Sequence, residues 1–247
     1  MKHVMEPQPF PFRLTGARVA VLGYGQRATQ HALGLRDAGN EVFVGSEGVS
    51  SVRARSDGFP AKAACSVVEG ASVVVVLLPD DEQASVYWSA IEPNVQRGAL
   101  LVFGRALALA TRAFEPRGVD VVLVAADETA CRVAVHVDVT GRALERAISY
   151  VHAAFGANVT VATTTIAAEV DAEIAALETH AGSEAASRAD VESAAARARD
   201  SHAPDEARIS FYEGLRDLVE ERSRRGARPR GSAVSQAASK APRRGTS

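Results

Sequence analysis

The chain has 247 residues, a formal net charge of −2, 47% hydrophobic residues and only 5% aromatic residues. This length predicts one or two domains with a sizeable core. A core built from small aliphatic side chains is typical of a parallel sheet covered by helices. With two cysteines the sequence indicates no disulfide framework, and its longest apolar run is too short to cross a bilayer. We therefore expect a soluble, cytoplasmic protein without a membrane partner.

The clearest motif is a glycine-rich turn between a predicted strand and a predicted helix. Four apolar residues, 19–22, precede Gly23-Tyr24-Gly25, and apolar residues then recur at helical spacing until Gly39. In such a turn the first glycine permits the bend, the second lets the backbone approach a pyrophosphate, and the helix N-terminus receives the negative charge. We predict a dinucleotide-binding site here, in preference to a structural turn that happens to be rich in glycine.

The polar loop after the second predicted strand, residues 45–51, is expected to meet the adenosine ribose. Glu47 is placed to accept hydrogen bonds from a ribose diol, which favours NAD. A 2′-phosphate, and therefore NADP, would instead be held by polar side chains of the same region: Ser46, Ser50, Ser51 and Arg53. Both cofactors remain open.

Further strands are predicted at residues 41–44, 73–78, 99–103, 119–124, 133–137 and 159–162, with helices from residue 79 and at residues 142–155. Strands that alternate with helices indicate an α/β fold, a doubly wound parallel sheet with right-handed crossovers. The ligand should lie across the carboxyl ends of the strands. The residues that follow the third long strand are therefore candidate contacts: Leu78, Pro79, Asp80, Asp81, Glu82 and Gln83.

The character of the sequence changes at residue 166. We expect residues 1–165 to form the dinucleotide-binding domain, with residues 1–14 as an arm on its first strand. Residues 166–222 should form a helical extension, interrupted at residues 202–205. Residues 223–247 carry basic but no acidic side chains. A nucleic-acid contact is one interpretation of this tail, but it has no aromatic side chain to stack on a base, so we expect disorder.

Several segments resemble, in order, the N-terminal half of ketol-acid reductoisomerase. They are LTGARVAVLGYGQRATQHALGLRDAG at 14–39, DGF at 57–59, LLPDDEQASVY at 77–87, IEPNVQRGALLVF at 91–103 and AVHVD at 134–138. The resemblance implies an enzyme that uses NADPH, sometimes NADH, and two Mg²⁺ ions to rearrange and reduce acetohydroxy acids in branched-chain amino-acid biosynthesis. By position, it assigns phosphate contacts to Tyr24, Gly25, Gln26 and Arg27, 2′-phosphate contacts to Ser50 and Ser51, and the nicotinamide side to residues 80–83.

The catalytic positions depart from this family. Arg105 stands where the family has a histidine, and a guanidinium cannot exchange a proton near neutral pH. The acidic segment at residues 127–130 replaces a Lys-Gly-Pro-Gly loop and is expected to repel an anionic acid. An arginine of the second-strand loop is also missing, which keeps the choice between NADP and NAD open.

The metal positions are incomplete. Glu213 and Asp217 match one carboxylate pair of the family, whereas the other pair aligns with Glu173 and Leu177, and leucine cannot bind a metal. A solvated helix face is the preferred interpretation of these carboxylates. Mg²⁺ is therefore expected only if the remnant site is functional.

These observations leave three hypotheses for function. The first is a diverged NAD(P)-dependent oxidoreductase that acts on a small hydroxy- or keto-acid-like substrate rather than acetolactate. The second is a dinucleotide-binding protein without catalysis, which serves as a partner or sensor. The third is a standard ketol-acid reductoisomerase, against which Arg105, Asp127 and Leu177 count.

The helices of residues 166–222 each carry one apolar seam, which must be covered. One hypothesis for this cover is a homodimer, in which a second copy of the chain packs on the seams. The alternative is that the seams fold back onto the chain's own sheet domain. The seam residues are Ile174, Leu177, Ile209, Tyr212, Leu215 and Leu218.

Overall fold

The computed structural model describes residues 14–127, 130–181, 184–199 and 205–227. The strands are β1 Arg18–Leu22, β2 Glu41–Gly45, β3 Ala61–Lys62, β4 Val73–Val76, β5 Leu100–Phe103, β6 Asp120–Ala126, β7 Ala130–Val137 and β8 Thr160–Thr163. The helices are α1 Gln26–Asp37, α2 Gly48–Ser56, α3 Ala64–Val68, α4 Asp80–Val86, the π-helical turn η1 Tyr87–Ile91, α5 Leu107–Ala110, α6 Ala143–Phe155, α7 Ile166–Ala181, α8 Glu184–Arg199 and α9 Glu206–Ala227. The predicted arm at 1–13, the helix break at 200–204 and the tail at 228–247 lie outside the described residues.

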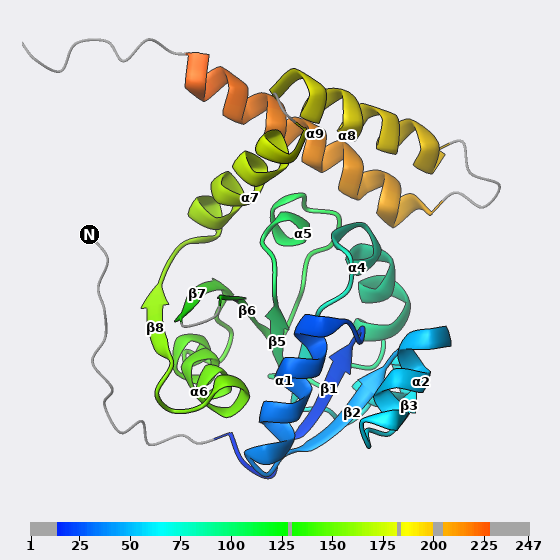
Figure 1. The fold of residues 1–247 in the computed structure, drawn as a ribbon, viewed down its shortest axis with the longest axis vertical. Helices are drawn as coiled ribbons and strands as arrows, with labels where there is room; N and C mark the ends of the chain where they lie inside the picture. Colours follow the sequence, from blue (N-terminus) through cyan, green and yellow to red (C-terminus); the bar gives the residue numbers. More distant parts are fainter. Residues whose placement is uncertain (1–13, 128–129, 182–183, 200–204, 228–247) are drawn as a thin grey trace, which may run out of the picture.

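The predicted doubly wound α/β fold is confirmed. The strands form one sheet in the order β3-β2-β1-β4-β5-β6-β7-β8, and β1 pairs in parallel with both β2 and β4. The chain therefore winds outward in one direction from β1 and then restarts in the other direction at β4 (Figure 1). Ligands of such sheets bind at this switch point, outside the carboxyl ends of the strands.

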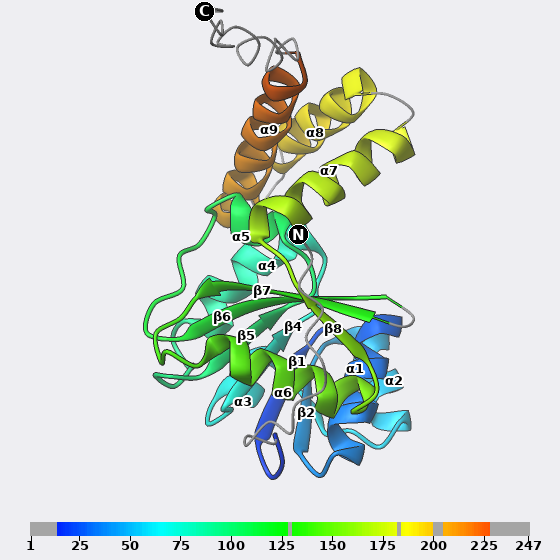
Figure 2. The ribbon, with the colours of Figure 1, turned by 90° about the vertical axis from the view of Figure 1, so that its left-hand side faces the viewer.

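The two faces of the sheet are buried by different helices (Figure 2). Along β1, Val19 and Val21 belong to the apolar cluster that includes α1 and α6, whereas Ala20 and Leu22 belong to the cluster with α4 and α5. Successive residues of a strand point to opposite faces. A strand that is covered on both faces must therefore be apolar throughout, which explains the valine run of β4.

One strand pair departs from the predicted parallel sheet, because β7 runs antiparallel to β6. Only residues 127–129 separate these two strands. A parallel pair requires a crossover connection of a dozen or more residues, whereas a short connection gives a hairpin. β8 then pairs in parallel with β7 after the crossover through α6.

Four predicted boundaries also differ. The loop expected at 45–51 is shorter, because α2 begins at Gly48 after Glu47 in an extended conformation. The strand expected at 73–78 ends at Val76. The part of the helical extension before the break expected at residues 202–205 is divided into α7 and α8, and α9 continues beyond residue 222 to Ala227.

The C-terminal helices lie beyond α4 and α5 (Figures 1 and 2). Ile174 and Leu215 are buried, and Leu177, Tyr212 and Leu218 are half-buried against the same apolar cluster as the sheet. Ile209 is also half-buried. Within one chain the apolar seams therefore fold back onto the sheet domain, because α4 and α5 offer apolar side chains that cover them. The homodimer stays a prediction. None of the described helices is long and apolar enough to cross a membrane.

Candidate dinucleotide-binding site

The turn between β1 and α1 has a conformation that requires glycine at its first position. Gly23 has φ +86°, and its amide donates to the Gly45 carbonyl at 2.9 Å. A Cβ at Gly23 would stand 3.0 Å from the Leu77 carbonyl oxygen, so the loop after β4 closes over this position. A larger residue would strain the turn and push the two loops apart.

The second glycine leaves open space at the start of α1. Gly25 is the N-cap residue of this helix, and a Cβ there would have no described atom within 4 Å. In the described part of the chain, no side chain caps the helix and no acidic residue lies in its first turn. The free amide groups and the helix dipole therefore favour an anion at this point.

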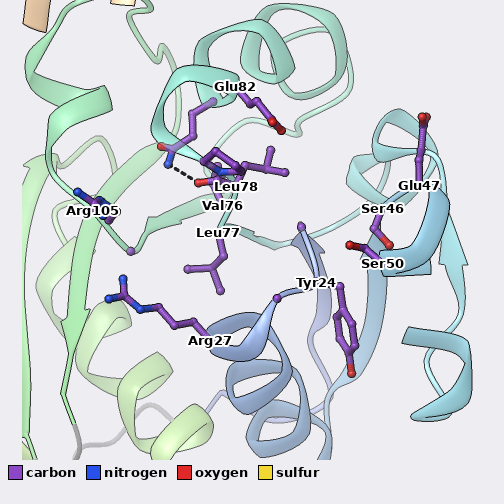
Figure 3. Close-up of a pocket in the computed structure, with 15 residues that line it drawn as sticks. Tyr24, Arg27, Ser46, Glu47, Ser50, Val76, Leu77, Leu78, Glu82 and Arg105 are labelled. Carbon is purple, nitrogen blue, oxygen red and sulfur yellow. Dashed lines mark hydrogen bonds between the residues drawn. The ribbon is translucent and has the colours of Figure 1, made fainter. Parts of the chain in front are cut away.

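A cavity of about 620 Å³ lies at the carboxyl ends of β1, β2, β4 and β5 (Figure 3). It is lined by Gly23, Tyr24, Gly25, Arg27, Ser46, Glu47, Ser50, Val76, Leu77, Leu78, Pro79, Glu82, Gln83, Gly104 and Arg105.

Eleven of the predicted contacts share this lining, and five do not. The five that lie outside it are Gln26, Ser51, Arg53, Asp80 and Asp81. The lining also contains three residues that were not predicted from the sequence: Val76, Leu77 and Gly104. Gly104 directly follows the predicted fourth strand, and its place at a carboxyl end was the available signal.

The adenosine end of the predicted site is formed by the loop after β2. The Ser46 hydroxyl is buried and has no hydrogen-bond partner among the described residues. Ser50 faces the cavity, whereas the Ser51 hydroxyl donates to the Gly48 carbonyl at 2.8 Å and accepts from Arg55. Glu47 is exposed at the N-terminus of α2, which no described side chain caps.

Tyr24 contributes to the cavity wall, but its hydroxyl is engaged elsewhere. The hydroxyl donates to Asp57 at 2.8 Å, and the ring packs on Phe59. Burial, together with this hydrogen bond, raises the pKa of Tyr24 to about 12. Tyr24 therefore remains neutral, and it holds the glycine turn against the segment that connects α2 to β3.

The other end of the cavity is formed by the loops after β4 and β5. Gln83 is 1% exposed, and its Nε2 donates to the Leu78 carbonyl at 2.9 Å. Its Oε1 is buried without a partner in the described part of the chain. The unpartnered oxygens of Ser46 and Gln83, with the space over Gly25, fit an extended polar ligand that spans the cavity.

Arg105 joins this end of the cavity to the C-terminal helices. Its Nε lies 2.8 Å from Asp80 Oδ2 and 3.4 Å from Glu173 Oε2. Glu173 in turn accepts a hydrogen bond of 2.7 Å from the Ala106 amide. Burial raises the pKa of Asp80 to about 6, although Arg105 opposes the shift. The cluster links α4, β5 and α7 directly behind the cavity.

Asp81 serves the neighbouring helix instead of the cavity. Its carboxylate forms an ion pair with Arg208 and accepts a hydrogen bond of 3.0 Å from the Tyr212 hydroxyl. Asp205, at the start of α9, accepts a hydrogen bond from Ser85 of α4. The loop that lines the cavity is therefore held by α9 as well as by α7.

The remnant carboxylates do not fit a metal site. Glu173 is paired with Arg105, Glu213 with Arg199 at 2.6 Å, and the exposed Asp217 with Arg216 at 3.2 Å. In the described residues, no group of three or more acidic, histidine or cysteine side chains is arranged for a metal ion. Each of these carboxylates is instead neutralised by a separate arginine.

The segment that replaces the family's glycine-rich loop is described only in part, because Glu128 and Thr129 lie outside the described residues. Asp127 lies 3.6 Å from Arg132, whose Nε donates to the buried Glu169 at 2.8 Å. The charge of Asp127 is therefore partly compensated by Arg132, which also anchors α7 to β7.

A family model and curated proteins of similar sequence point to the same family. A family model described as "Acetohydroxy acid isomeroreductase, NADPH-binding domain" matches residues 13–160. Curated relatives named "Ketol-acid reductoisomerase (NADP(+))" from Xanthomonas euvesicatoria pv. vesicatoria and Xanthomonas axonopodis pv. citri are each 33% identical over 177 residues, covering 65% of this chain and 53% of theirs. The chain thus spans about half the length of these curated relatives.

Solved structures share the fold at low identity. An NADH-preferring ketol-acid reductoisomerase from an uncultured archean has a TM-score of 0.61 and 20% identity, covering 85% of this chain and 84% of its own. A putative oxidoreductase from Jannaschia sp. CCS1 has a TM-score of 0.54 and 17% identity, covering 88% and 86%.

Proposed function

Because this chain belongs to the acetohydroxy acid isomeroreductase family through its NADPH-binding domain, we propose that it is a diverged NADP(H)-dependent oxidoreductase. Its proposed substrate is a small hydroxy or keto acid other than acetolactate. The observation that carries the proposal is the start of α1 at Gly25, where free amide groups open onto the cavity. Such a helix start is suited to a pyrophosphate.

The proposed pose follows from the polar groups along the cavity. The pyrophosphate lies over Gly25 with Arg27 beside it, the adenosine ribose lies near Ser46 and Ser50, and the nicotinamide lies near Gln83. A bound nicotinamide would supply the hydride. The chain binds the phosphates, orients the ring and excludes water with Leu77 and its neighbours.

We propose NADPH in preference to NADH. The unpartnered Ser46 hydroxyl and the free N-terminus of α2 together suit a 2′-phosphate. The matching family model describes an NADPH-binding domain, and the relatives are named for NADP(+). Glu47 opposes this choice, since its carboxylate would repel a phosphate, and its contribution is tested below.

The substrate is proposed to differ from acetolactate because two requirements of that chemistry are altered. Arg105 replaces the histidine of the resembling family, and it is engaged by Asp80 and Glu173. The metal remnants Glu213 and Asp217 are occupied by other arginines. A two-metal rearrangement has no ligand set among these residues.

The second candidate function is dinucleotide binding without catalysis. The observation in its favour is that no histidine, cysteine or lysine is found among the described residues that line the cavity, and the hydroxyl of Tyr24 is engaged by Asp57. Among the described lining residues, the acidic side chains Glu47 and Glu82 remain as groups that exchange protons. In this alternative the protein senses the dinucleotide or presents it to a partner.

An assay of NADPH consumption tests the proposal against its alternatives. The full chain is mixed with NADPH or NADH and one acid from a panel of small 2-keto acids, or with acetolactate, in Mg²⁺ and in EDTA. We expect turnover of a 2-keto acid in EDTA and no turnover of acetolactate in either buffer. Robust Mg²⁺-dependent turnover of acetolactate would contradict the proposal, and NADPH binding without turnover of any acid would support the second candidate.

A further inference from the structure

Arg105 is the charged side chain at the end of the cavity farthest from the adenosine site. It is the second residue after β5, and Figure 3 places it opposite the group formed by Ser46, Glu47 and Ser50. The Arg105 side chain is 39% exposed, whereas Asp80 and Glu173 are only 15% and 17% exposed. The cation is thus the member of the cluster that faces the cavity.

Both carboxylates make their closest contact with the guanidinium at Nε, at 2.8 Å for Asp80 and 3.4 Å for Glu173. These are ion-pair contacts, since neither Nε nor Glu173 Oε2 makes a hydrogen bond with a described residue. Within the described part of the chain, the two terminal nitrogens of Arg105 donate no hydrogen bond, so their N–H groups are available to a ligand.

The charges at this end of the cavity permit an additional anion. Arg27 reaches toward the same region from α1, and its charge acts on Asp80. Within the cluster of Asp80, Arg105 and Glu173, Arg105 lines the cavity whereas both carboxylates lie outside its lining, and Arg27 adds a second lining cation beside the lining carboxylate of Glu82. An anion in the cavity would meet the positive members of the cluster first.

We propose that Arg105 is the residue that binds the carboxylate of the substrate, through its two terminal nitrogens. A guanidinium edge matches a carboxylate in a bidentate fork, and a guanidinium held in place by ion pairs is already oriented for that contact. Arg105 would then be the residue that determines specificity for acids. Binding of the substrate carboxylate would not require a divalent metal ion. The inference rests on the proposed function, because it assumes that a nicotinamide occupies the neighbouring space.

Oxamate is a suitable probe, because it carries a planar carboxylate beside a carbonyl group, and its ethyl ester lacks the charge. The full chain is first titrated with NADPH, and the NADPH-loaded protein is then titrated with oxamate and with ethyl oxamate in EDTA, by calorimetry. The variants are Arg105→Met and Arg105→Lys. The matched control is Arg222→Met, because Arg222 also contacts two carboxylates, Asp171 and Glu178, at 30% exposure but outside the cavity lining.

We expect oxamate, but not its ester, to bind the wild-type protein in EDTA. Arg105→Met should weaken oxamate binding by at least ~10-fold, and Arg105→Lys should give an intermediate loss because an ammonium lacks the bidentate edge. NADPH affinity should fall by less than oxamate affinity in the two Arg105 variants and should be unchanged in Arg222→Met. Arg222→Met should bind oxamate like the wild-type protein.

Unaltered oxamate affinity in a folded Arg105→Met variant would overturn the inference, as would binding that requires Mg²⁺ or an equal loss of NADPH affinity. If Arg105→Met does not fold, Arg105→Lys decides by the same criteria. A wild-type protein that binds NADPH but not oxamate would overturn the role of Arg105 and leave the dinucleotide site intact. Failure of the first titration, with NADPH alone, would instead contradict the proposed function on which the inference rests.

Discussion

Glu47 places a negative charge at the adenosine end of the cavity, beside Ser46 and Ser50. A carboxylate there favours a ribose diol and repels a 2′-phosphate. We predict that Glu47→Gln raises the affinity for NADPH relative to NADH by ~3- to 10-fold, a size typical of a partly screened charge near a surface. Fluorescence titrations of both dinucleotides measure this ratio.

Glu41 provides the control for this substitution, because it is an exposed glutamate at the opposite end of β2. Glu41→Gln should leave both affinities unchanged. A ratio that is equally unchanged in Glu47→Gln would show that Glu47 does not face the ribose, and the proposed adenosine position would have to be revised.

His31 is a buried titratable residue that lies away from the cavity, between α1 and α6. Its Nδ1 is hydrogen-bonded to the Tyr150 hydroxyl. Its ring packs edge-on against Phe155, with 4.7 Å between the two ring centroids. Burial, with a further contribution from Arg27, lowers the pKa of His31 from 6.5 to about 4. Because the unfolded chain then binds the proton more readily, this histidine contributes stability above pH 6.5 that is lost as pH falls toward 4.

We predict that His31→Gln, which keeps a polar group but does not titrate, flattens the fall in unfolding free energy between pH 6.5 and 4. The part of the fall due to His31 is about 3 kcal/mol. Urea denaturation across this range measures it, with the exposed His180→Gln as the control. An unchanged slope in His31→Gln would refute this role of His31.

At the scale of elements, α9 packs against the end of α5 at a glycine. A Cβ on Gly214 would lie 2.8 Å from Thr111 Cβ and 2.9 Å from Thr111 Cα, and it would also collide with the Thr111 carbonyl oxygen. Gly→Ala inside an exposed helix stabilises by about 1 kcal/mol. At Gly214 the added methyl group would collide with the backbone of Thr111, so the substitution should lower the unfolding free energy instead of raising it. We predict that Gly214→Ala destabilises the protein by ~1–3 kcal/mol.

Thermal and urea denaturation check this prediction, with Asp217→Ala as the control on the exposed face of the same helix. The control should change the unfolding free energy by less than ~0.5 kcal/mol. A stabilising effect of Gly214→Ala would mean that α9 does not approach α5 as closely as described here.

Elements were predictable where a local pattern determines them. The valine run of β4 and the glycine turn before α1 identify a buried strand and a helix start from sequence alone. The direction of β7 was missed although the short connection to β6 carried the signal. The π-helical turn at Tyr87–Ile91 has no comparable local pattern, and its first residue, Tyr87, stacks on Phe114, which is distant in the sequence.

At the scale of the whole molecule, the two halves of the site differ in how far sequence could predict them. The pyrophosphate side depends on residues close together in the chain, and most of its predicted contacts line one cavity. The cluster of Asp80, Arg105 and Glu173 depends on α7 folding back over the sheet, which no local pattern encodes. The same folding back of α9 turns Asp81 from a predicted cofactor contact into the partner of Arg208 and Tyr212.

The proposed function requires that the cavity over Gly25 binds a nicotinamide dinucleotide. A branched side chain at Gly25 would occupy the open space at the start of α1 without meeting a described protein atom at its Cβ. Gly25→Val should therefore keep the fold and remove the space for the pyrophosphate. Gln30→Val is the matched control, because Gln30 is exposed on the same helix and outside the cavity lining.

The decisive measurement is a fluorescence titration of NADPH against the wild-type protein, Gly25→Val and Gln30→Val, with thermal melting to show that each variant is folded. We predict that the wild-type protein and Gln30→Val bind NADPH equally and that Gly25→Val loses at least ~100-fold in affinity, as expected when a pyrophosphate is displaced from a helix N-terminus. Equal NADPH affinity in a folded Gly25→Val variant, or no binding by the wild-type protein, would contradict it.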